Sequence, residues 1–387
     1  MRLAVIETSS QGGLLHYAVQ LADALAERGN AVDLVVPAHN ELAGHVGPAR
    51  RREILPAPTP PEGRLSHIRL LRRARVACRL LHAWGRINWQ LRRGRYEAAI
   101  VTSDVDLWPM AVAVLLTLAT RGGTRVAGIC HSVRPLNRWA GDDMFARSSL
   151  LSRLLARMYA RMDVVFVHGE SSRSEFEATW PAGHLVVIPH GDERIFSGRP
   201  PAPSEQKRAL FFGEWRKVKG LDVLMEAFER LLARNPEVRL TIAGAPCPVD
   251  LDPDVVREWA ARQGDAVEVI DRYVPVEEVA RLFGAARAVV TPYLVAYQSG
   301  VVHLAMTMER AVVASEVGDL ISVVLDGETG LTVPPADPDA LADALERVLE
   351  DGDLARRLGG EGRRRLLAGS SWELVAERIE AALSANV

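Results

Sequence analysis

Short apolar runs alternate with amphipathic stretches along the chain. In the first half, runs with the length of buried strands occupy residues 3–6, 31–37, 98–102, 126–129, 164–167 and 185–188. Between the first two runs, apolar residues recur at the spacing of one helix face, at Leu14, Ala18, Leu21 and Leu25. Strands that alternate with helices predict a parallel sheet covered by helices.

The second half repeats this alternation. Apolar runs occupy residues 210–212, 240–243, 267–270 and 288–290, and amphipathic segments follow at 337–349, 354–367 and 372–383. The intervening stretch GRPPAPSEQ, residues 198–206, has the composition of an interdomain linker. The sequence therefore predicts an α/β protein with an N-terminal domain (1–197), a linker (198–206), a C-terminal domain (207–369) and a last helix within 370–387.

The composition is that of a globular protein. The 387 residues suit two domains of ordinary size, and apolar and charged residues make up 48% and 25% of them. Glu7 interrupts the first apolar run, and the most apolar segment, Leu107 to Ala119, is shorter than a bilayer requires. We therefore expect neither a secretory signal nor a transmembrane helix. Cys78, Cys130 and Cys247 lack the spacing of a disulfide frame or a zinc site, which favours a reducing cytoplasm.

Charge is unevenly distributed, although the formal net charge is only −2. Between Arg50 and Arg95 there are thirteen arginines but only two glutamates, with leucines and tryptophans interleaved. The stretch Arg64 to Arg95 could lie on an anionic membrane surface, with Trp84 and Trp89 at the interface. It could equally form a solvated helix whose arginine stems cover apolar surface. Nucleic acid is not an expected partner, because neither a zinc-finger spacing nor an RNP-like aromatic cluster accompanies the charge.

The segment Leu210 to Leu232 predicts an anion site. A short apolar strand ends at Gly213, a loop carries Arg216 and Lys219, and a helical pattern begins at Leu221. Unpaired N–H groups at a helix N-terminus, together with two cations beside them, would hold a diphosphate. The alternative is a solvated basic turn in an ordinary strand–helix unit.

Three other turns lie where a predicted strand ends or a helix begins. Gly12 and Gly13 follow the first strand, His131 follows the strand at 126–129, and Ser299 and Gly300 precede a helical pattern. Ligands of α/β proteins bind at such positions, and glycines let the backbone approach a ligand closely. Each has a plainer alternative: a tight turn, a hydrogen-bonded loop histidine, and a helix N-cap.

Two strands of the second half end at Gly244 and just before the segment 272–274, so these backbones are expected at the same sheet edge as the basic loop. A nucleotide base could bind there. Asp104 and Asp106 have the spacing of a metal-binding Asp-x-Asp element. Because Pro109 follows them, helix capping is the better interpretation, and no metal is expected.

Taken in order, these motifs resemble the family 4 glycosyltransferases, which are retaining enzymes of the GT-B fold. The matching stretches are GGLLHYAVQLADALAERG, IPHGD, FFGEWRKVKGLDVLMEAF, PY followed by QSGVVHLAM, AVVASEVGDL, and DGETGLTVPPADPDALADAL. The resemblance covers nearly the whole chain. It implies two Rossmann-like domains with parallel sheets that face each other across a cleft. The N-terminal domain would bind the acceptor, the C-terminal domain the nucleotide-sugar, and the final helix would cross back to the N-terminal domain.

The resemblance also implies roles for single residues. Arg216 and Lys219 would neutralise the donor diphosphate, and His131 would hydrogen-bond the donor sugar. The other implied donor-binding positions are Gly12, Gly13, Gly213, Gly244, Arg272, Tyr273, Val274, Gln298, Ser299 and Gly300. Within this set, the first glycine pair would lie against the donor phosphates and sugar. The segment 272–274 would border the base, and the backbone at 299–300 would meet the phosphate.

The sequence departs from the family pattern at two places. Ala296 and Leu304 stand where many members carry the two carboxylates of a Glu-x7-Glu motif, the second of which binds ribose. The chain instead resembles a subgroup with Gln-Ser-Gly at this loop, in which Gln298 would substitute. Glu214 occupies the arginine position of the usual GR-x4-KG pattern, and Arg216 would take over that role.

The implied reaction is transfer of a sugar, with retention, from a nucleoside diphosphate sugar to a hydroxyl of a saccharide or lipid-linked saccharide in bacterial glycan biosynthesis. No cofactor and no metal is expected. The expected location is the cytoplasm, at the inner face of the cell membrane if the arginine-rich stretch binds lipid. Two alternatives stay open: a sugar-nucleotide epimerase or phosphorylase on the same fold, and a non-catalytic relative that binds a sugar nucleotide or a membrane surface.

Overall fold

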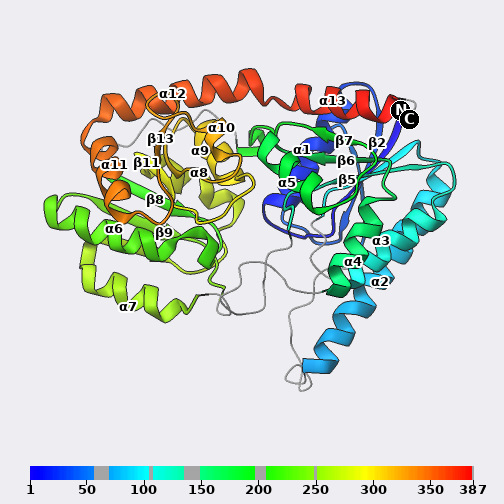
Figure 1. Cartoon of the computed structure of the whole chain (residues 1–387), viewed down its shortest axis with the longest axis horizontal. Helices are drawn as coiled ribbons and strands as arrows, with labels where there is room; N and C mark the ends of the chain where they lie inside the picture. The colour runs from blue at the N-terminus through cyan, green and yellow to red at the C-terminus, as the bar shows by residue number, and fades with distance from the viewer. Residues whose placement is uncertain (56–68, 104–107, 135–148, 197–205, 248–250, 386–387) are drawn as a thin grey trace. The chain divides into compact units, whose positions relative to one another are not determined.

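The computed structural model describes residues 1–55, 69–103, 108–134, 149–196, 206–247 and 251–385 (Figure 1). Within these residues the chain forms two compact units. The first contains the described residues of Met1–Leu136 and Arg147–Pro189 together with the C-terminal segment that starts at Trp372. The second contains those of His190–Ser371.

The first unit is built on a seven-stranded parallel sheet with the order β3-β2-β1-β4-β5-β6-β7. Its strands are β1 (Arg2–Ile6), β2 (Ala31–Pro37), β3 (Arg50–Leu55), β4 (Ala98–Val101), β5 (Arg125–Ile129), β6 (Val164–Val167) and β7 (Leu185–Val187). Its helices are α1 (Gly13–Glu27), α2 (Arg69–Gly94), α3 (Trp108–Thr120), α4 (Ser149–Tyr159), α5 (Glu170–Thr179) and α13 (Trp372–Ser384). The central strand β1 is buried from Leu3 to Ile6, as expected for a sheet with helices on both faces.

The second unit is built on a six-stranded parallel sheet with the order β10-β9-β8-β11-β12-β13. Its strands are β8 (Arg208–Phe212), β9 (Arg239–Ala243), β10 (Val267–Ile270), β11 (Ala288–Thr291), β12 (Ala311–Ser315) and β13 (Leu331–Val333). Its helices are α6 (Leu221–Arg234), α7 (Pro253–Gln263), α8 (Val276–Ala285), α9 (Gly300–Thr307), α10 (Leu320–Val323), α11 (Pro338–Glu350) and α12 (Gly352–Gly369). Short 3-10 helices at Arg194–Phe196, Lys217–Lys219 and Gly264–Ala266 complete it.

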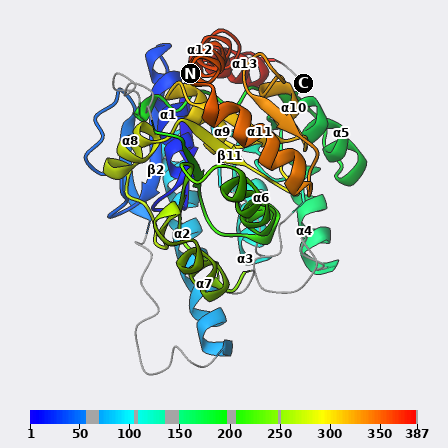
Figure 2. The same ribbon diagram turned by 90° about the vertical axis from the view of Figure 1, so that its left-hand side faces the viewer.

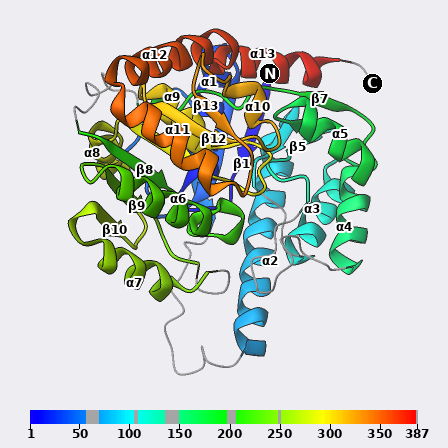
Figure 3. The same cartoon turned by 60° about the vertical axis from the view of Figure 1, so that its left-hand side comes forward.

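Two apolar cores lie on opposite faces of the second sheet. Helices α6 and α11 lie side by side over one face, as Figures 2 and 3 show. Helices α8 and α9 contribute to the core on the other face. The alternation of side chains along β11 supplies both cores, since Ala288 and Val290 belong to one and Val289 to the other.

The predicted fold class is confirmed, because both sheets are parallel and helices connect their strands. Three strands were not predicted. Strand β3 is an edge strand with the sequence RRREIL, which lacks the apolar run of a buried strand. The apolar residues of β12 follow those of α9 closely, so the pattern does not separate the two elements. Strand β13 comprises three residues, too few to show a period.

The boundary between the units falls after Pro189, upstream of the predicted domain end at residue 197. Two contacts explain why the next residues join the second unit. The ring of His190 lies 4.6 Å from that of His303, and the backbone N–H of Glu193 donates to Oγ1 of Thr307 at 3.1 Å. The predicted linker, 198–206, lies outside the described residues except for its last position.

The last helix, α13, packs on α1 within the first unit. Trp372, at its start, is fully buried, and its ring meets the edge of the Tyr17 ring at a centroid distance of 5.0 Å. Near its end, Glu380 accepts a hydrogen bond from Nε of Arg28 at 2.8 Å. The chain therefore returns to its first unit at its last described helix.

The arginine-rich stretch divides into a strand and a helix. Its first arginines belong to β3, where Nε of Arg52 lies 3.5 Å from Oδ1 of Asp33 on β2. In α2, Trp84 is fully buried, so the expectation that it faces a membrane interface is wrong. Trp89 is 55% exposed, and the guanidinium of Arg93 lies 4.4 Å from its ring centroid. None of the described helices combines the length and apolar character that crossing a bilayer needs.

Candidate active site

The basic loop of the second unit starts where β8 ends. Gly213 follows the strand, and Arg216 is only 5% exposed. The residues Lys217–Lys219 form one 3-10 turn, which Gly220 ends in the left-handed conformation with φ of 64°. Helix α6 begins directly afterwards, as the sequence predicted. A buried arginine and a lysine therefore lie in the turn that leads into a helix N-terminus.

Neighbouring strand ends hold this loop in place. The N–H of Gly213 donates to the carbonyl of Ala243 at 2.9 Å, and that of Trp215 donates to the carbonyl of Ala245, also at 2.9 Å. A Cβ atom on Gly244 would overlap the carbonyl oxygen of Gly213. Gly213 and Gly244, both predicted site residues, are therefore in contact. Their backbones lie so close together that position 244 has no room for a side chain.

The loop after β11 lies against the basic loop. The N–H of Leu294 donates to the carbonyl of Val218 at 2.9 Å, and a Cβ atom on Gly220 would overlap the carbonyl oxygen of Pro292. The ammonium of Lys219 lies 3.8 Å from the ring centroid of Tyr293, a cation–π contact. Tyr293 thus contacts the ammonium group of Lys219, which was predicted to neutralise the donor diphosphate.

The same tyrosine connects the basic loop to helix α9. Its hydroxyl lies 3.3 Å from Oγ of Ser299, which accepts a hydrogen bond from the N–H of Val302. Ser299 is therefore the N-cap of α9, and Gly300 is the first helical residue. The structure brings Lys219 together with Ser299 and Gly300, which were predicted from a separate motif.

Two buried side chains surround the start of α9. Oε1 of Glu193 and the ring of His190 lie within van der Waals distance of the position that a Cβ atom on Gly300 would take. Nδ1 of His303 lies 2.9 Å from the carbonyl oxygen of Ser299, and burial lowers the pKa of this imidazole. The ring is therefore neutral at pH 7 and donates to the carbonyl. The sequence pattern did not identify Glu193 or His303 as neighbours of the site.

Three polar atoms at this edge are buried without a hydrogen-bond partner among the described residues: Oε1 of Gln298, Oγ1 of Thr291 and Nε1 of Trp215. Buried polar atoms are normally hydrogen-bonded. An unpaired acceptor in a loop at a sheet edge is therefore a candidate partner for a hydroxyl group of a ligand. Gln298 is the residue predicted to replace the missing ribose-binding glutamate.

The segment 272–274 is less closely tied to this cluster. Nη2 of Arg272 lies 2.8 Å from Oε2 of Glu278, and the arginine is 53% exposed at the side-chain level. Its Nη1 donates to the carbonyl of Tyr273 at 3.2 Å. Val274 is buried in the core with α8 and α9. The side chains of Arg272 and Val274 are thus engaged elsewhere.

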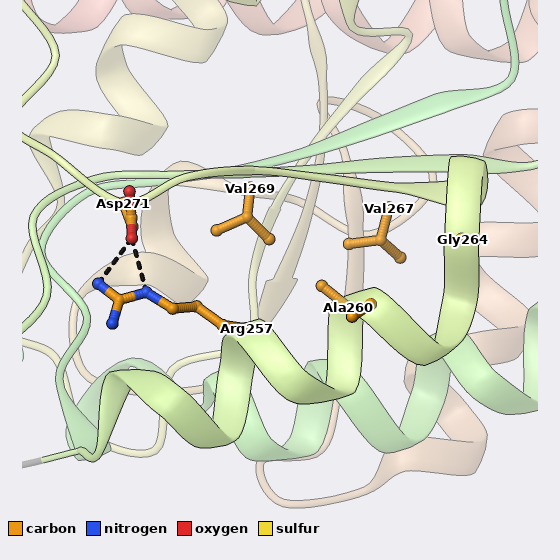
Figure 4. A pocket seen from close by; sticks show the side chains of 7 residues that line it. Arg257, Ala260, Gly264, Val267, Val269 and Asp271 are labelled. Atoms are coloured by element: carbon orange, nitrogen blue, oxygen red, sulfur yellow. Dashed lines mark hydrogen bonds and ion pairs between the residues drawn. The ribbon is translucent and has the colours of Figure 1, made fainter.

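An open pocket of 350 Å³ lies between α7 and β10. Figure 4 shows Arg257 and Asp271 pointing toward each other at one end, with Nη2 and Oδ2 2.6 Å apart, and Val267 and Val269 along the strand. None of the predicted site residues lines this pocket. We therefore do not assign the reaction to it.

In the first unit, the glycine turn already contacts a carboxylate. Gly12 has φ of 84° and precedes α1, and its N–H donates to Oε1 of Glu41. The same oxygen lies 2.6 Å from Nε2 of His16. The sequence predicted that a ligand phosphate would approach this turn, but it did not identify Glu41. A Cβ atom on Gly12 or on Gly13 would meet nothing within 4 Å, so the turn also borders open space.

A buried glutamate stands beside this turn, at the end of β1. Glu7 accepts hydrogen bonds from Oγ1 of Thr102 at 2.8 Å, from Oγ of Ser103 at 3.0 Å and from the N–H of Ser9 at 2.7 Å. Burial raises the pKa of Glu7. These bonds tie the ends of β1 and β4 together and fix the start of the glycine turn.

His131 lies in a cluster of rings just past the end of β5. Its Nδ1 is 3.1 Å from Nε2 of His168, and the Tyr17 ring meets its edge at a centroid distance of 4.8 Å. Burial lowers the pKa of His131 to about 4, partly offset by a hydrogen bond with the backbone of Thr102. The ring is therefore neutral at pH 7. His131 occupies a sheet edge as predicted, whereas His168 was not singled out in the sequence.

The remaining predictions concern a metal. Asp104 and Asp106 lie outside the described residues. Within the described part of the chain, no group of three or more His, Cys, Asp or Glu side chains is arranged to hold a metal ion.

Sequence models of two glycosyltransferase groups match the chain. The one described as Glycosyltransferase Family 4 matches residues 11–191, and the one described as Glycosyl transferases group 1 matches residues 206–351. An alpha-maltose-1-phosphate synthase from Mycolicibacterium smegmatis is 30% identical over 64% of this chain and 70% of its own length. A D-inositol 3-phosphate glycosyltransferase from Thermobifida fusca is 26% identical over 97% of this chain and 89% of its own length. A D-inositol 3-phosphate glycosyltransferase from a Nocardioides species is 31% identical, but the match covers only 52% of that relative's length.

Solved structures show the same architecture. Sucrose-phosphate synthase from Thermosynechococcus elongatus matches with a TM-score of 0.74 and 23% identity, over 98% of this chain and 97% of the other. HepE from Anabaena, in complex with UDP-glucose, matches with a TM-score of 0.71 and 15% identity, over 99% of both chains. Two units with parallel sheets and these structural neighbours define the GT-B fold of glycosyltransferases. The chain belongs to the family 4 glycosyltransferases.

Proposed function

We propose that the protein transfers a glycosyl group from a nucleoside diphosphate sugar to a hydroxyl acceptor with retention at the anomeric carbon. The observation that carries the proposal is the cluster of Lys219, Tyr293 and Ser299, in which a cation and the N-terminus of α9 lie at one sheet edge. Arg216 lies three residues before the lysine in the same loop and is buried. Two fixed positive charges and a helix N-terminus suit a diphosphate.

The proposed chemistry is electrostatic. As the glycosidic bond to the diphosphate breaks, negative charge grows on the leaving phosphate. Arg216, Lys219 and the N-termini of α6 and α9 would stabilise that charge because they are held in position before the reaction starts. No protein nucleophile is required: the enzyme would align an acceptor hydroxyl against the anomeric carbon. His131 would hydrogen-bond the donor sugar through its neutral ring.

Ribose recognition would fall to Gln298. Its buried Oε1 has no hydrogen-bond partner among the described residues, and the loop that carries it leads directly into the N-cap Ser299. An amide oxygen accepts a hydroxyl hydrogen as a carboxylate does, but without the negative charge. This supports Gln298 as the substitute for the glutamate that the family pattern places at Leu304.

The donor nucleotide can be identified by thermal unfolding against UDP, GDP and ADP. HepE from Anabaena binds UDP and UDP-glucose, so uridine nucleotides are tested first. We expect one nucleotide to raise the melting temperature, because a ligand that binds only the folded state at about 100 times its Kd adds about 2.7 kcal/mol of stability. Gln298→Ala should reduce the shift with the same nucleotide. If no nucleotide shifts the transition at millimolar concentration, the proposed donor site is wrong.

We propose that the acceptor is a hydroxyl of a saccharide or lipid-linked saccharide. Because relatives are named for D-inositol 3-phosphate, small phosphorylated polyols belong in the acceptor screen. Release of free sugar or an epimer without any acceptor would instead favour the epimerase or phosphorylase alternative. Nucleotide binding with no turnover on any acceptor would favour a non-catalytic relative.

A peripheral membrane contact through α2 is a second, separate proposal. It is supported by the exposed Trp89 and Leu81, beside arginines such as Arg86 and Arg93. We expect vesicles that contain anionic lipid to retain the protein at low salt, and retention to fall as salt screens the charges. Trp89→Ser should weaken retention, because the indole contributes apolar contact. Equal retention on neutral vesicles would contradict an electrostatic origin.

A further inference from the structure

Neighbouring strands of the first sheet bring two histidines together. Strands β5 and β6 pair in parallel, with Ile129 opposite Phe166, and the ladder continues one step further through the N–H of Cys130, which donates to the carbonyl of Phe166 at 2.8 Å. His131 and His168 come next on the two strands. Their rings lie 4.9 Å apart, and the contact joins residues 37 positions apart in sequence.

The contact between these rings couples their proton positions. A neutral imidazole has one N–H and one bare nitrogen, so a close nitrogen–nitrogen contact requires one ring to donate and the other to accept. Nδ1 of His131 faces Nε2 of His168 at 3.1 Å. Because burial keeps His131 neutral at pH 7, its tautomer depends on this partner and on its hydrogen bond with the backbone of Thr102.

Packing also holds both rings in orientation. The Tyr17 ring meets the edges of His131 and His168, at centroid distances of 4.8 and 5.4 Å. Trp372 of α13 supports Tyr17 from another side, and both are fully buried. Nδ1 is directed at His168, so the proposed hydrogen bond to a sugar hydroxyl falls to Nε2 on the opposite ring edge, an atom that is buried in this structure.

We infer that His168 is a positioning residue: its hydrogen bond to Nδ1 of His131 selects the tautomer and ring orientation in which His131 meets the donor sugar. The inference rests on the role proposed for His131. It assigns no contact between His168 and the substrate. Pairs of this kind are familiar around metal-ligating histidines, where the partner of the second nitrogen sets the ring's orientation.

Nitrogen-15 NMR of the histidine side chains tests this directly, because the two ring nitrogens of each tautomer have different chemical shifts. His131→Gln assigns the His131 signals. We expect a single tautomer for His131 in the unaltered protein and a mixture, or the opposite tautomer, in His168→Phe. This readout needs no activity. If the His131 shifts are the same in His168→Phe, the inference is wrong. Should that variant fail to fold, His168→Leu provides the same comparison, because leucine also lacks a hydrogen-bonding group.

Kinetics separate positioning from a merely structural effect. We expect His168→Phe to lower kcat about tenfold with little change in the KM of the donor, and His168→Gln to recover part of the loss because an amide can still hydrogen-bond Nδ1. His184→Phe, a histidine replacement elsewhere in the same unit, should leave kcat within about twofold. An unchanged kcat in His168→Phe contradicts the inference. If His131→Gln also retains full activity, the role proposed for His131 in donor binding is wrong. The effect of His168 on the His131 tautomer is then judged from the NMR spectra alone.

Discussion

Lys219→Ala is expected to lower kcat about a hundredfold, and Arg216→Ala to have an effect of the same size. Removal of one preorganised charge from the departing diphosphate costs about 3 kcal/mol of transition-state stabilisation. Lys219 is held by the ring of Tyr293, and Arg216 is buried, so neither charge has to be ordered when the donor binds. Steady-state kcat and KM with the donor identified by thermal unfolding provide the measurement.

The same loop offers a matched control. Lys217 belongs to the same 3-10 turn and is exposed, so Lys217→Ala removes an equal charge from the loop without removing a charge from the proposed site. Its kcat should stay within about twofold of the unaltered protein. Melting temperatures distinguish a catalytic loss from misfolding, which matters most for the buried Arg216. Near-normal kcat in both Arg216→Ala and Lys219→Ala would refute the assignment of the diphosphate site.

Gly220→Ala is expected to lower the free energy of unfolding by about 3 kcal/mol and to reduce activity severely. Two costs add at this position. The residue has φ of 64°, which costs a non-glycine residue about 1 kcal/mol. The added Cβ would also overlap the carbonyl oxygen of Pro292, and overpacking of this kind costs about 1–3 kcal/mol. Relief of the overlap would move the loop after β11, and with it Tyr293, away from the basic loop.

Comparison with Gly327→Ala isolates the second cost. Gly327 has φ of 71° in the same unit, but a Cβ atom there would meet nothing within 4 Å. This variant should therefore lose only about 1 kcal/mol and keep its activity. Urea unfolding of the two variants gives the comparison. Equal losses of stability would show that the contact with Pro292 is not what limits position 220.

The sequence predicted those parts of the site whose signal is local. Arg216 and Lys219 lie between a strand pattern and a helix pattern within one short segment, so their place at a sheet edge follows from periodicity alone. Ser299 was recognisable as a helix start for the same reason. The residue that joins them, Tyr293, was not predicted, because a single aromatic residue after a strand has no periodicity of its own.

Other omissions have different causes. His168 follows a predicted strand just as His131 does, so applying the same argument to the next strand would have found it. Glu41 could not have been found in this way. It meets Gly12 only because the loop after β2 folds back on the glycine turn, and many carboxylates in the chain are equally compatible with the sequence pattern. The apolar pattern did not reveal strand β3, because most of its residues are charged and an edge strand needs no apolar face.

The packing of α13 on α1 determines when each unit can be completed on the ribosome. The described residues of the second unit lie between His190 and Ser371, whereas the first unit needs Trp372 to cover Tyr17. Synthesis proceeds from the N-terminus, so the first sheet must wait, with part of its apolar surface open, until the second unit and α13 have been made. The half of the protein that is made first is therefore expected to be the half that finishes folding last.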